Sequence, residues 1–218
     1  GVFAIVLVTN LYKRSQLFLT ATKIIAVYCL SYLSLAIIQE GSFQQIDLIY
    51  FAYFGASGFL TLLSYPLIYF EEKIFGLVSD ISLLELSDTN NPLLRELSQK
   101  APGTFQHSLQ VANLAEAAIL KINGNALLVR TGALYHDIGK MKKPMYFIEN
   151  QSTGVNPHDE LSFEESAQII INHIQEGIKL ARKSNLPDVL VDFIRTHHGT
   201  STVMYFYKQY IKNFPKEE

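Results

Sequence analysis

Two long apolar segments limit what this chain can fold into more than any other feature of its sequence. Residues 17–38 contain one charged residue, Lys23, and residues 46–70 form a second apolar segment. A helix needs about 20 predominantly apolar residues to cross a bilayer, and Lys23 lies close enough to one end for its ammonium group to reach the interface. The two segments predict two transmembrane helices, and residues 2–9, VFAIVLVT, predict the end of a third. A buried helical hairpin of a soluble protein is the alternative.

The basic residues predict how these helices are oriented. The first short loop contains Lys13 and Arg14, whereas the second, residues 39–47, contains no basic residue. Loops rich in Lys and Arg stay in the cytoplasm. We therefore expect the first loop to be cytoplasmic, the second external, and the chain after Phe70 cytoplasmic, which describes a multi-pass protein of the cell membrane.

Composition changes along the chain and divides it into regions. Charged residues make up 17% of the whole, below the roughly 25% of soluble proteins, and most of them follow residue 70. We predict transmembrane helices over residues 1–70, connector helices over 71–100 and a cytoplasmic domain over 101–218. The net charge of −2 gives no reason to expect a nucleic acid polymer as a partner. The single cysteine, Cys29, excludes an internal disulfide and a cysteine-based zinc site.

The region after the membrane segments has helical patterning throughout. Gly and Pro fall between periodic segments, and no run of alternating β-branched residues predicts a strand. In the connector, apolar spacing predicts a helix to about Leu86, and the turn cluster SDTNNP precedes a second helix. Ser162 and Glu165 predict a capping box, Thr104 is a candidate helix cap, and Gly199 is a candidate helix terminator. The fold class predicted for the whole chain is all-α.

Five of the six histidines fall at inward-facing or helix-end positions of these helices. His107 precedes Val111 and Leu114 by four and seven residues, which predicts a shared apolar face. His173 lies on the apolar face of its helix and is predicted to point into the core. A single histidine of this kind is most often a satisfied core residue, but burying several imidazoles without compensation is costly. The five are His107, His136, His173, His197 and His198, and Asp137 adjoins the second of them. Imidazole with carboxylate suits Fe, Mn or Zn, so the pattern predicts a metal site.

The order of these residues resembles that of a known family. The sequence His…His-Asp…His…His-His, with HDIGK at 136–140 and HHGT at 197–200, is similar to the binuclear branch of the HD-domain metal phosphohydrolases. The stretches ELSDTNNPLLRELSQKAPGTFQHSLQVANLAEAA, NPHDELSFEESAQIIINHI and DFIRTHHGTS resemble, more closely, the seven-transmembrane receptors with an intracellular HD hydrolase domain, of the PgpH type. The resemblance implies C-terminal transmembrane helices of a larger membrane region, followed by a helical HD-type domain that hydrolyses cyclic di-AMP to pApA.

The resemblance also implies a set of ligands for two divalent transition-metal ions, Fe or Mn. One ion is expected at His107, His136 and Asp137. The other is expected at Asp137, His173, His197 and His198, so that Asp137 bridges the two. The family adds a further Asp to the first ion from a later helix. Because no Asp follows Asp192 in this sequence, we expect the domain to be truncated at its C-terminus.

Metal chemistry then predicts the catalytic roles. Two ions about 3.5–4 Å apart clamp a phosphodiester and activate the water that attacks phosphorus. We assign Asp137 and Lys140 as catalytic residues, with Lys140 contacting a phosphate oxygen or the leaving group. A solvated lysine at a helix end is the alternative for Lys140. His158 lies either near the mouth of the site or in a simple loop role. Thr200 and residues 205–207 line a base pocket, pack in the core or contact the membrane surface.

The sequence is also compatible with other functions. Cyclic di-GMP hydrolysis is the nearest alternative, although the GYP motif of that branch is missing. A nucleotide triphosphohydrolase and a non-catalytic membrane nucleotide sensor are further alternatives. Transport is disfavoured because Lys23 is the sole charge within the first span. The expected partners are a cyclic dinucleotide substrate and membrane lipid, and the sequence leaves room for a homodimer.

Overall fold

The computed structural model describes residues 16–41, 46–151 and 154–214, and over these residues the chain forms helices and turns without a strand. The chain divides into two compact units, Gly1–Glu85 and Leu86–Glu218. The all-α prediction is confirmed for the described residues. The predicted third span at residues 2–9 and the basic residues of the first loop lie outside them.

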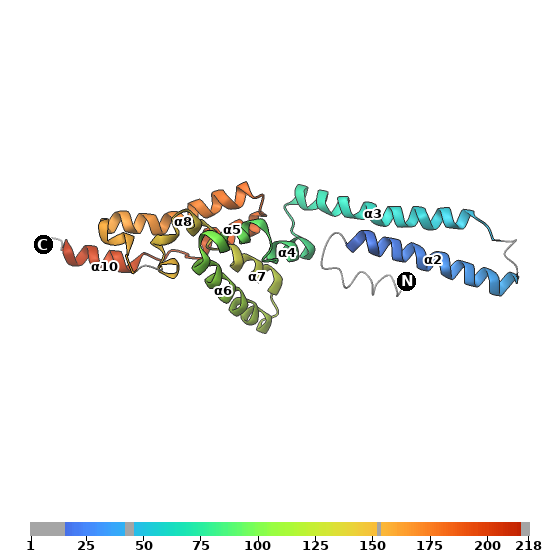
Figure 1. Ribbon diagram of the computed structural model, residues 1–218, viewed down its shortest axis with the longest axis horizontal. Helices are drawn as coiled ribbons and strands as arrows, with labels where there is room; N and C mark the ends of the chain where they lie inside the picture. The colour runs from blue at the N-terminus through green and yellow to red at the C-terminus, as the bar shows by residue number, and fades with distance from the viewer. Residues whose placement is uncertain (1–15, 42–45, 152–153, 215–218) are drawn as a thin grey trace. The chain divides into compact units, whose positions relative to one another are not determined.

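The first unit contains a pair of long helices that run side by side (Figure 1). Helix α2 spans Gln16–Glu40 and helix α3 spans Ile49–Phe75. Aromatic side chains of the two helices pack against each other, and the ring centroids of Tyr32 and Phe51 lie 5.5 Å apart. The segments Phe18–Gln39 and Ile49–Phe75 are long and apolar enough to cross a membrane, and both precede the second unit. The predicted spans therefore coincide with real helices to within a few residues.

The connector differs from its prediction. Helix α3 continues to Phe75, and Gly76 then ends it with a left-handed φ of 62°, a conformation that glycine adopts without steric cost. A separate helix, α4, spans Asp80–Ser87. The division between the two units falls within this helix, after Glu85. The predicted single helix to Leu86 is thus wrong. The turn before the next helix is confirmed, since the Asn91 side chain accepts a hydrogen bond from the Leu93 amide at 3.0 Å and caps it.

Over its described residues, the second unit contains six further α-helices and a stretch of short 3₁₀-helices, η2 to η5. The α-helices are α5 (Pro92–Lys100), α6 (Pro102–Lys121), α7 (Ala126–Tyr135), α8 (Phe163–Lys183), α9 (Asp188–Thr196) and α10 (Met204–Asn213). The 3₁₀-helices are η2 (Ile138–Lys142), η3 (Pro144–Tyr146), η4 (Ile148–Asn150) and η5 (Pro157–Glu160).

The end of α7 lies at the centre of this unit. Its last five residues, Thr131 to Tyr135, are all buried, and α7 contacts both α6 and α9. Leu134 and Ile194 are fully buried, and each such side chain contributes about 1.5–3 kcal/mol through removal from water. The Tyr135 hydroxyl donates a hydrogen bond to the Leu86 carbonyl at 2.8 Å, and burial raises the pKa of this phenol above its usual value. His136 and Asp137, which follow Tyr135, therefore extend from a buried, closely packed helix end.

Helix α8 approaches η2 closely at a glycine. A Cβ atom added at Gly139 would lie 1.8 Å from the His173 carbonyl oxygen and 2.5 Å from the Gly177 nitrogen. No other residue fits there without moving one of the two backbones. This contact brings the middle of α8 against the segment that follows Asp137.

Predictions about individual helices have mixed outcomes. The capping box of Ser162 and Glu165 is confirmed at the start of α8, and Gly199, with a φ of 56°, follows the end of α9. Thr104 is not a cap, because α6 begins at Pro102 and Ala101 occupies the cap position. The apolar face predicted for His107 is also wrong. Leu114 is 73% exposed, because α6 instead buries its small side chains, namely Thr104, Ser108 and Ala112.

Candidate metal centre

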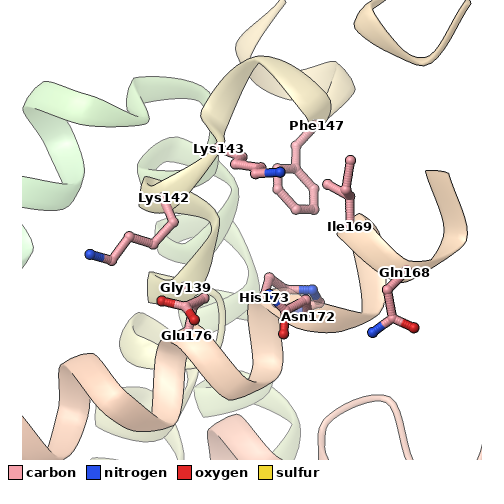
Figure 2. A pocket seen from close by; sticks show the side chains of 9 residues that line it. All are labelled: Gly139, Lys142, Lys143, Phe147, Gln168, Ile169, Asn172, His173 and Glu176. Carbon is pink, nitrogen blue, oxygen red and sulfur yellow. The ribbon is translucent and has the colours of Figure 1, made fainter. Parts of the chain in front are cut away.

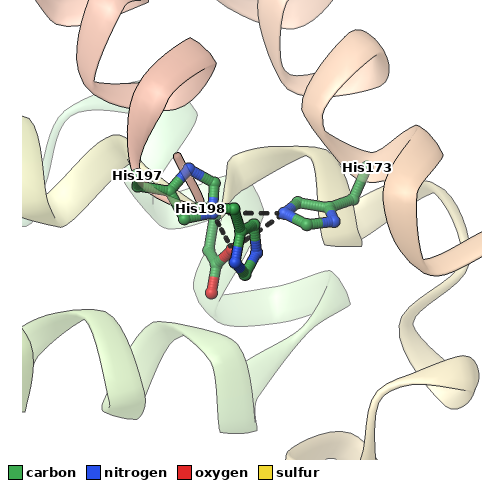
Figure 3. A group of neighbouring side chains, drawn as sticks. His173, His197 and His198 are labelled. Atoms are coloured by element: carbon green, nitrogen blue, oxygen red, sulfur yellow. Dashed lines mark hydrogen bonds and ion pairs between the residues drawn. The ribbon is translucent and has the colours of Figure 1, made fainter. Parts of the chain in front are cut away.

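All six residues predicted as metal ligands lie together in the second unit. His107 comes from α6, His136 and Asp137 follow α7, His173 comes from α8, and His197 and His198 follow α9. They form two groups in which every ligand atom lies within 4.8 Å of the others: His107, His136 and Asp137, and Asp137, His173, His197 and His198. Figure 3 shows His173, from α8, facing His197 and His198 at the end of α9.

Asp137 belongs to both groups, and its two oxygens divide between them. Oδ2 lies 3.1 Å from His136 Nε2 and 4.0 Å from His107 Nε2. Oδ1 lies 3.3 Å from His173 Nε2 and 3.5 Å from His197 Nε2. The carboxylate side chain is 3% exposed. Each oxygen therefore faces one group, as a carboxylate that bridges two ions would.

Backbone carbonyls set the tautomers of three of these histidines. The Nδ1 atoms of His136 and His197 lie 2.7 and 2.9 Å from carbonyl oxygens three residues earlier in the chain, and Nδ1 of His173 bonds to the carbonyl of Ile170 in the same way. A carbonyl oxygen can only accept, so each Nδ1 carries the hydrogen. In the neutral imidazole, Nε2 then presents a lone pair toward Asp137.

This arrangement favours a bound cation. The Nε2 atoms of His173 and His197 are 3.3 Å apart, and both face Asp137 Oδ1, a buried atom without a hydrogen-bond donor. Lone pairs and a carboxylate packed this closely repel one another unless a positive charge lies between them. Imidazole nitrogen and carboxylate oxygen are ligands that suit Fe, Mn and Zn. The residues present therefore fit a pair of divalent transition-metal ions.

A proton can supply part of this positive charge when no metal is bound. Burial opposes a charge on His136, but its hydrogen bond to Asp137 prevails and raises the pKa of the imidazole. Burial would likewise raise the pKa of Asp137, but His136, His173 and His197 hold it well below its usual range. A metal ion binding here would displace the proton, because imidazole ligands bind metal in the neutral form.

One side of the centre is open to solvent. The His107 side chain is 47% exposed, and His198 is also exposed. Partial burial, together with the neighbouring His197 and His173, lowers the pKa of His198. The low pKa favours the neutral form, so His198 is ready to bind a metal at neutral pH.

Lys140 lies inside the centre. Its Nζ is 2.8 Å from Asp137 Oδ2, and its side chain is 13% exposed, so the alternative of a solvated lysine is wrong. A second carboxylate, Glu149 on η4, contacts the same Nζ at 2.9 Å. Burial lowers the pKa of Lys140, but the two carboxylates outweigh this effect and raise it. Burial likewise opposes the charge of Glu149, but its contact with Lys140 lowers the pKa of that carboxyl. Glu149 is not among the predicted site residues, because it lies in a stretch without helical periodicity.

A cavity of about 460 Å³ lies beside His173. Figure 2 shows it between the 3₁₀ segment, which contributes Lys142, Lys143 and Phe147, and helix α8, which contributes Gln168, Asn172 and His173. The predicted base-pocket residues, Thr200 and residues 205–207, are not among those that line it. Phe206 and Tyr207 line a different cavity, beside Phe163 and Ile171 of α8, and the Phe206 ring also packs against His158, with ring centroids 5.1 Å apart.

His158 is part of the loop structure. It is 9% exposed, its Nε2 lies 3.0 Å from the Tyr146 carbonyl oxygen, and it belongs to neither ligand group. Its contacts with Tyr146 and Phe206 hold η5 against η3 and α10. A loop role, rather than a place at the mouth of the site, accounts for these contacts.

Two family models match this chain. The HD domain model matches residues 104–215. The model described as the 7TM receptor with intracellular HD hydrolase matches residues 1–79. The two matches cover the ligand groups and the pair of long apolar helices, respectively.

Curated relatives and a solved structure extend this comparison. The chain is 39% identical to the cyclic-di-AMP phosphodiesterase PgpH of Listeria monocytogenes serotype 1/2a (strain 10403S) and 41% identical to that of Bacillus subtilis (strain 168), over 95% of this chain in each case. It spans 29% of the length of each relative. The crystal structure of the L. monocytogenes PgpH HD domain in complex with cyclic-di-AMP is similar, with a TM-score of 0.57 and 46% identity over 60% of this chain and 61% of that one.

Proposed function

The chain belongs to the HD domain family, and we propose that it is a metal-dependent phosphodiesterase that hydrolyses cyclic di-AMP to the linear dinucleotide pApA. The observation that carries the proposal is the sharing of Asp137 between two groups of ligands. Binuclear centres of this type suit phosphodiester hydrolysis. The similarity to PgpH, whose HD domain binds cyclic di-AMP, supports this substrate over cyclic di-GMP.

The ligand groups define the metal-binding residues of the proposal. His107, His136 and Asp137 would hold one ion, and Asp137, His173, His197 and His198 would hold the other. Fe or Mn is the proposed metal. When bound, the pair of ions polarises the phosphodiester and supplies a nucleophile from water at neutral pH.

The protein's own groups have defined tasks in this reaction. Asp137 fixes the spacing of the two ligand groups through its two oxygens. Lys140 is positively charged and largely excluded from water. Its ammonium group would contact a phosphate oxygen or the leaving oxygen and offset the charge that develops there. The open side at His107 and His198 would admit the substrate.

We also propose the cellular arrangement of the chain. Residues 1–70 would be the last transmembrane helices of a multi-pass membrane region in contact with lipid, residues 71–100 a connector, and residues 101–218 a cytoplasmic hydrolase domain. The match of residues 1–79 to a receptor family with an intracellular hydrolase supports this assignment. The basic residues Lys13 and Arg14, which lie in the predicted first loop, support the same orientation.

The test is a hydrolysis assay with matched variants. The full-length protein in detergent, loaded with Mn²⁺ or Fe²⁺, is incubated separately with cyclic di-AMP and cyclic di-GMP, and the products are separated by chromatography. Asp137→Asn should abolish formation of pApA. Asp192→Asn is the control, because this exposed carboxylate pairs only with Arg195 at the surface among the described contacts. Tight nucleotide binding without hydrolysis of either substrate would instead identify a membrane-bound nucleotide sensor.

A further inference from the structure

Lys140 is held from two sides by carboxylates. Its Nζ lies 2.8 Å from Asp137 Oδ2 and 2.9 Å from Glu149 Oε1. It also lies 4.9 Å from the centre of the Phe147 ring, within the range of a cation–π contact. A lysine side chain is flexible and carries its charge at a single point, so fixed partners decide where that charge lies.

Glu149 is itself fixed to the first turn of α6. Thr104 Oγ1 donates a hydrogen bond to Glu149 Oε1 at 3.0 Å and accepts one from Asn150 Nδ2 at 2.8 Å. The Thr104 amide donates to Asn150 Oδ1 at 3.1 Å. Gly103 allows this approach, because a Cβ atom there would lie 1.7 Å from the Glu149 carbonyl oxygen. The same helix carries His107 one turn further on, so Glu149 is locked to an element of the candidate metal centre.

Metal binding changes the balance between the two carboxylates. Asp137 is shared by both ligand groups, whereas Glu149 belongs to neither. Divalent ions bound to the Asp137 carboxylate would compete with Lys140 for the carboxylate oxygens. Their positive charge would also repel the ammonium group of Lys140. Glu149 is then the carboxylate that remains available to hold Lys140 in place.

We propose that Glu149 is a positioning residue, which keeps the ammonium group of Lys140 beside the metal centre when both ligand groups are occupied. Glu149 acts through Lys140, and the proposal rests on the proposed function of that residue. Thr104 and Asn150 contribute to this positioning, because their hydrogen bonds fix the Glu149 carboxylate that holds Lys140.

Lysine labelling tests this proposal without an activity measurement. The protein, with and without Mn²⁺, is treated with acetic anhydride, and acetylation of each lysine is followed by peptide mass spectrometry. In Glu149→Gln with Mn²⁺, we expect Lys140 to be acetylated about tenfold faster than in the unaltered protein, because loss of a carboxylate at this distance favours the neutral, reactive amine. The control is Glu96→Gln, which removes an exposed partner of Lys100 and should leave the rate at Lys140 unchanged. An unchanged rate at Lys140 in Glu149→Gln would overturn the proposal.

Kinetics provides the second test. Glu149→Gln should lower kcat for cyclic di-AMP by about 10- to 100-fold with KM changed less than about twofold, and the bound Mn²⁺ should stay at the unaltered level. In a Lys140→Met background the same substitution should have almost no further effect, since residues that act as a unit are not additive. Effects that multiply in the double variant would instead indicate a structural role for Glu149.

A second pair of variants covers the case in which Glu149→Gln fails to fold. Thr104→Val removes the hydroxyl that fixes Glu149, and Thr104→Ser keeps it. We expect faster acetylation of Lys140 in the valine variant and restoration in the serine variant. If the unaltered protein hydrolyses neither cyclic dinucleotide, the proposed function fails, but the acetylation rates still decide the role of Glu149. If it hydrolyses cyclic di-AMP while the acetylation rates do not change, the positioning role alone fails.

Discussion

Gly139 offers a stringent test of how the candidate metal centre is assembled. In Gly139→Ala, the new Cβ atom would lie 1.8 Å from the His173 carbonyl oxygen, and real Cβ atoms essentially never approach closer than 3.0 Å. The two backbones must therefore separate by about 1.2 Å, because neither contacting atom belongs to a flexible side chain. Overpacking of this kind costs about 1–3 kcal/mol.

The separation should affect the metal centre more than the fold. Asp137 lies two residues before Gly139, and His173 is the residue whose carbonyl must move. Functional groups need to be held within about 0.5 Å of their productive geometry, and a misplacement of 1 Å costs about 100-fold in rate. We expect Gly139→Ala to lose most of its Mn²⁺ and about 100-fold in kcat, with a melting temperature lower by several degrees.

Three measurements on one preparation check this expectation: metal content by mass spectrometry, hydrolysis of cyclic di-AMP, and thermal unfolding. Gly55→Ala is the control, because an added Cβ at this exposed glycine meets no atom within 4 Å. Full metal content and unaltered turnover in Gly139→Ala would refute the reasoning that this contact sets the distance between Asp137 and His173.

Three further predictions concern stability and pH. Tyr135→Phe should lower the free energy of unfolding by about 1–3 kcal/mol in urea titrations, because the Leu86 carbonyl loses the hydrogen bond from the buried hydroxyl. Ser162→Ala should lower it by about 1 kcal/mol in the same assay, because the capping box of α8 is lost. The pKa of Glu149 is lowered from 4.5, so its ion pair contributes stability above about pH 4.5 and loses that contribution as the pH falls through the lower folded value. Between pH 5 and 3, the metal-free protein should therefore lose more stability than Glu149→Gln, and equal losses in urea titrations would contradict this assignment.

Helical periodicity accounts for the part of the candidate site that the sequence could predict. His173 lies on the buried stripe of α8 with Gly177 and Ala181, as the 3.6-residue repeat requires. The same reasoning failed for His107, since α6 buries small side chains instead of Val111 and Leu114. A hydrophobic pattern identifies the buried face only when large side chains fill the core.

Glu149 could not be predicted because its partners are distant in sequence and its own segment has no repeat. It lies 45 residues after Thr104 on a 3₁₀-helix of three residues. Short 3₁₀-helices bury no regular stripe of side chains. The packing of η4 on the start of α6 brings these residues together, and the close approach depends on Gly103. Only the tertiary structure contains that information.

The end of α7 explains why adjacent His and Asp residues can serve one site. On a continuous helix, neighbouring side chains point about 100° apart, but α7 ends at Tyr135 and Asp137 already leaves the helical conformation, with φ −110° and ψ 13°. His136 uses Nδ1 to bond the Ala133 carbonyl, one of the carbonyl groups that a helix end leaves without a partner. His197 does the same with the Ile194 carbonyl at the end of α9. The hydrogen bonds that complete these two helix ends thus also fix Nε2 as the atom that faces Asp137, so helix termination and ligand orientation have the same physical cause.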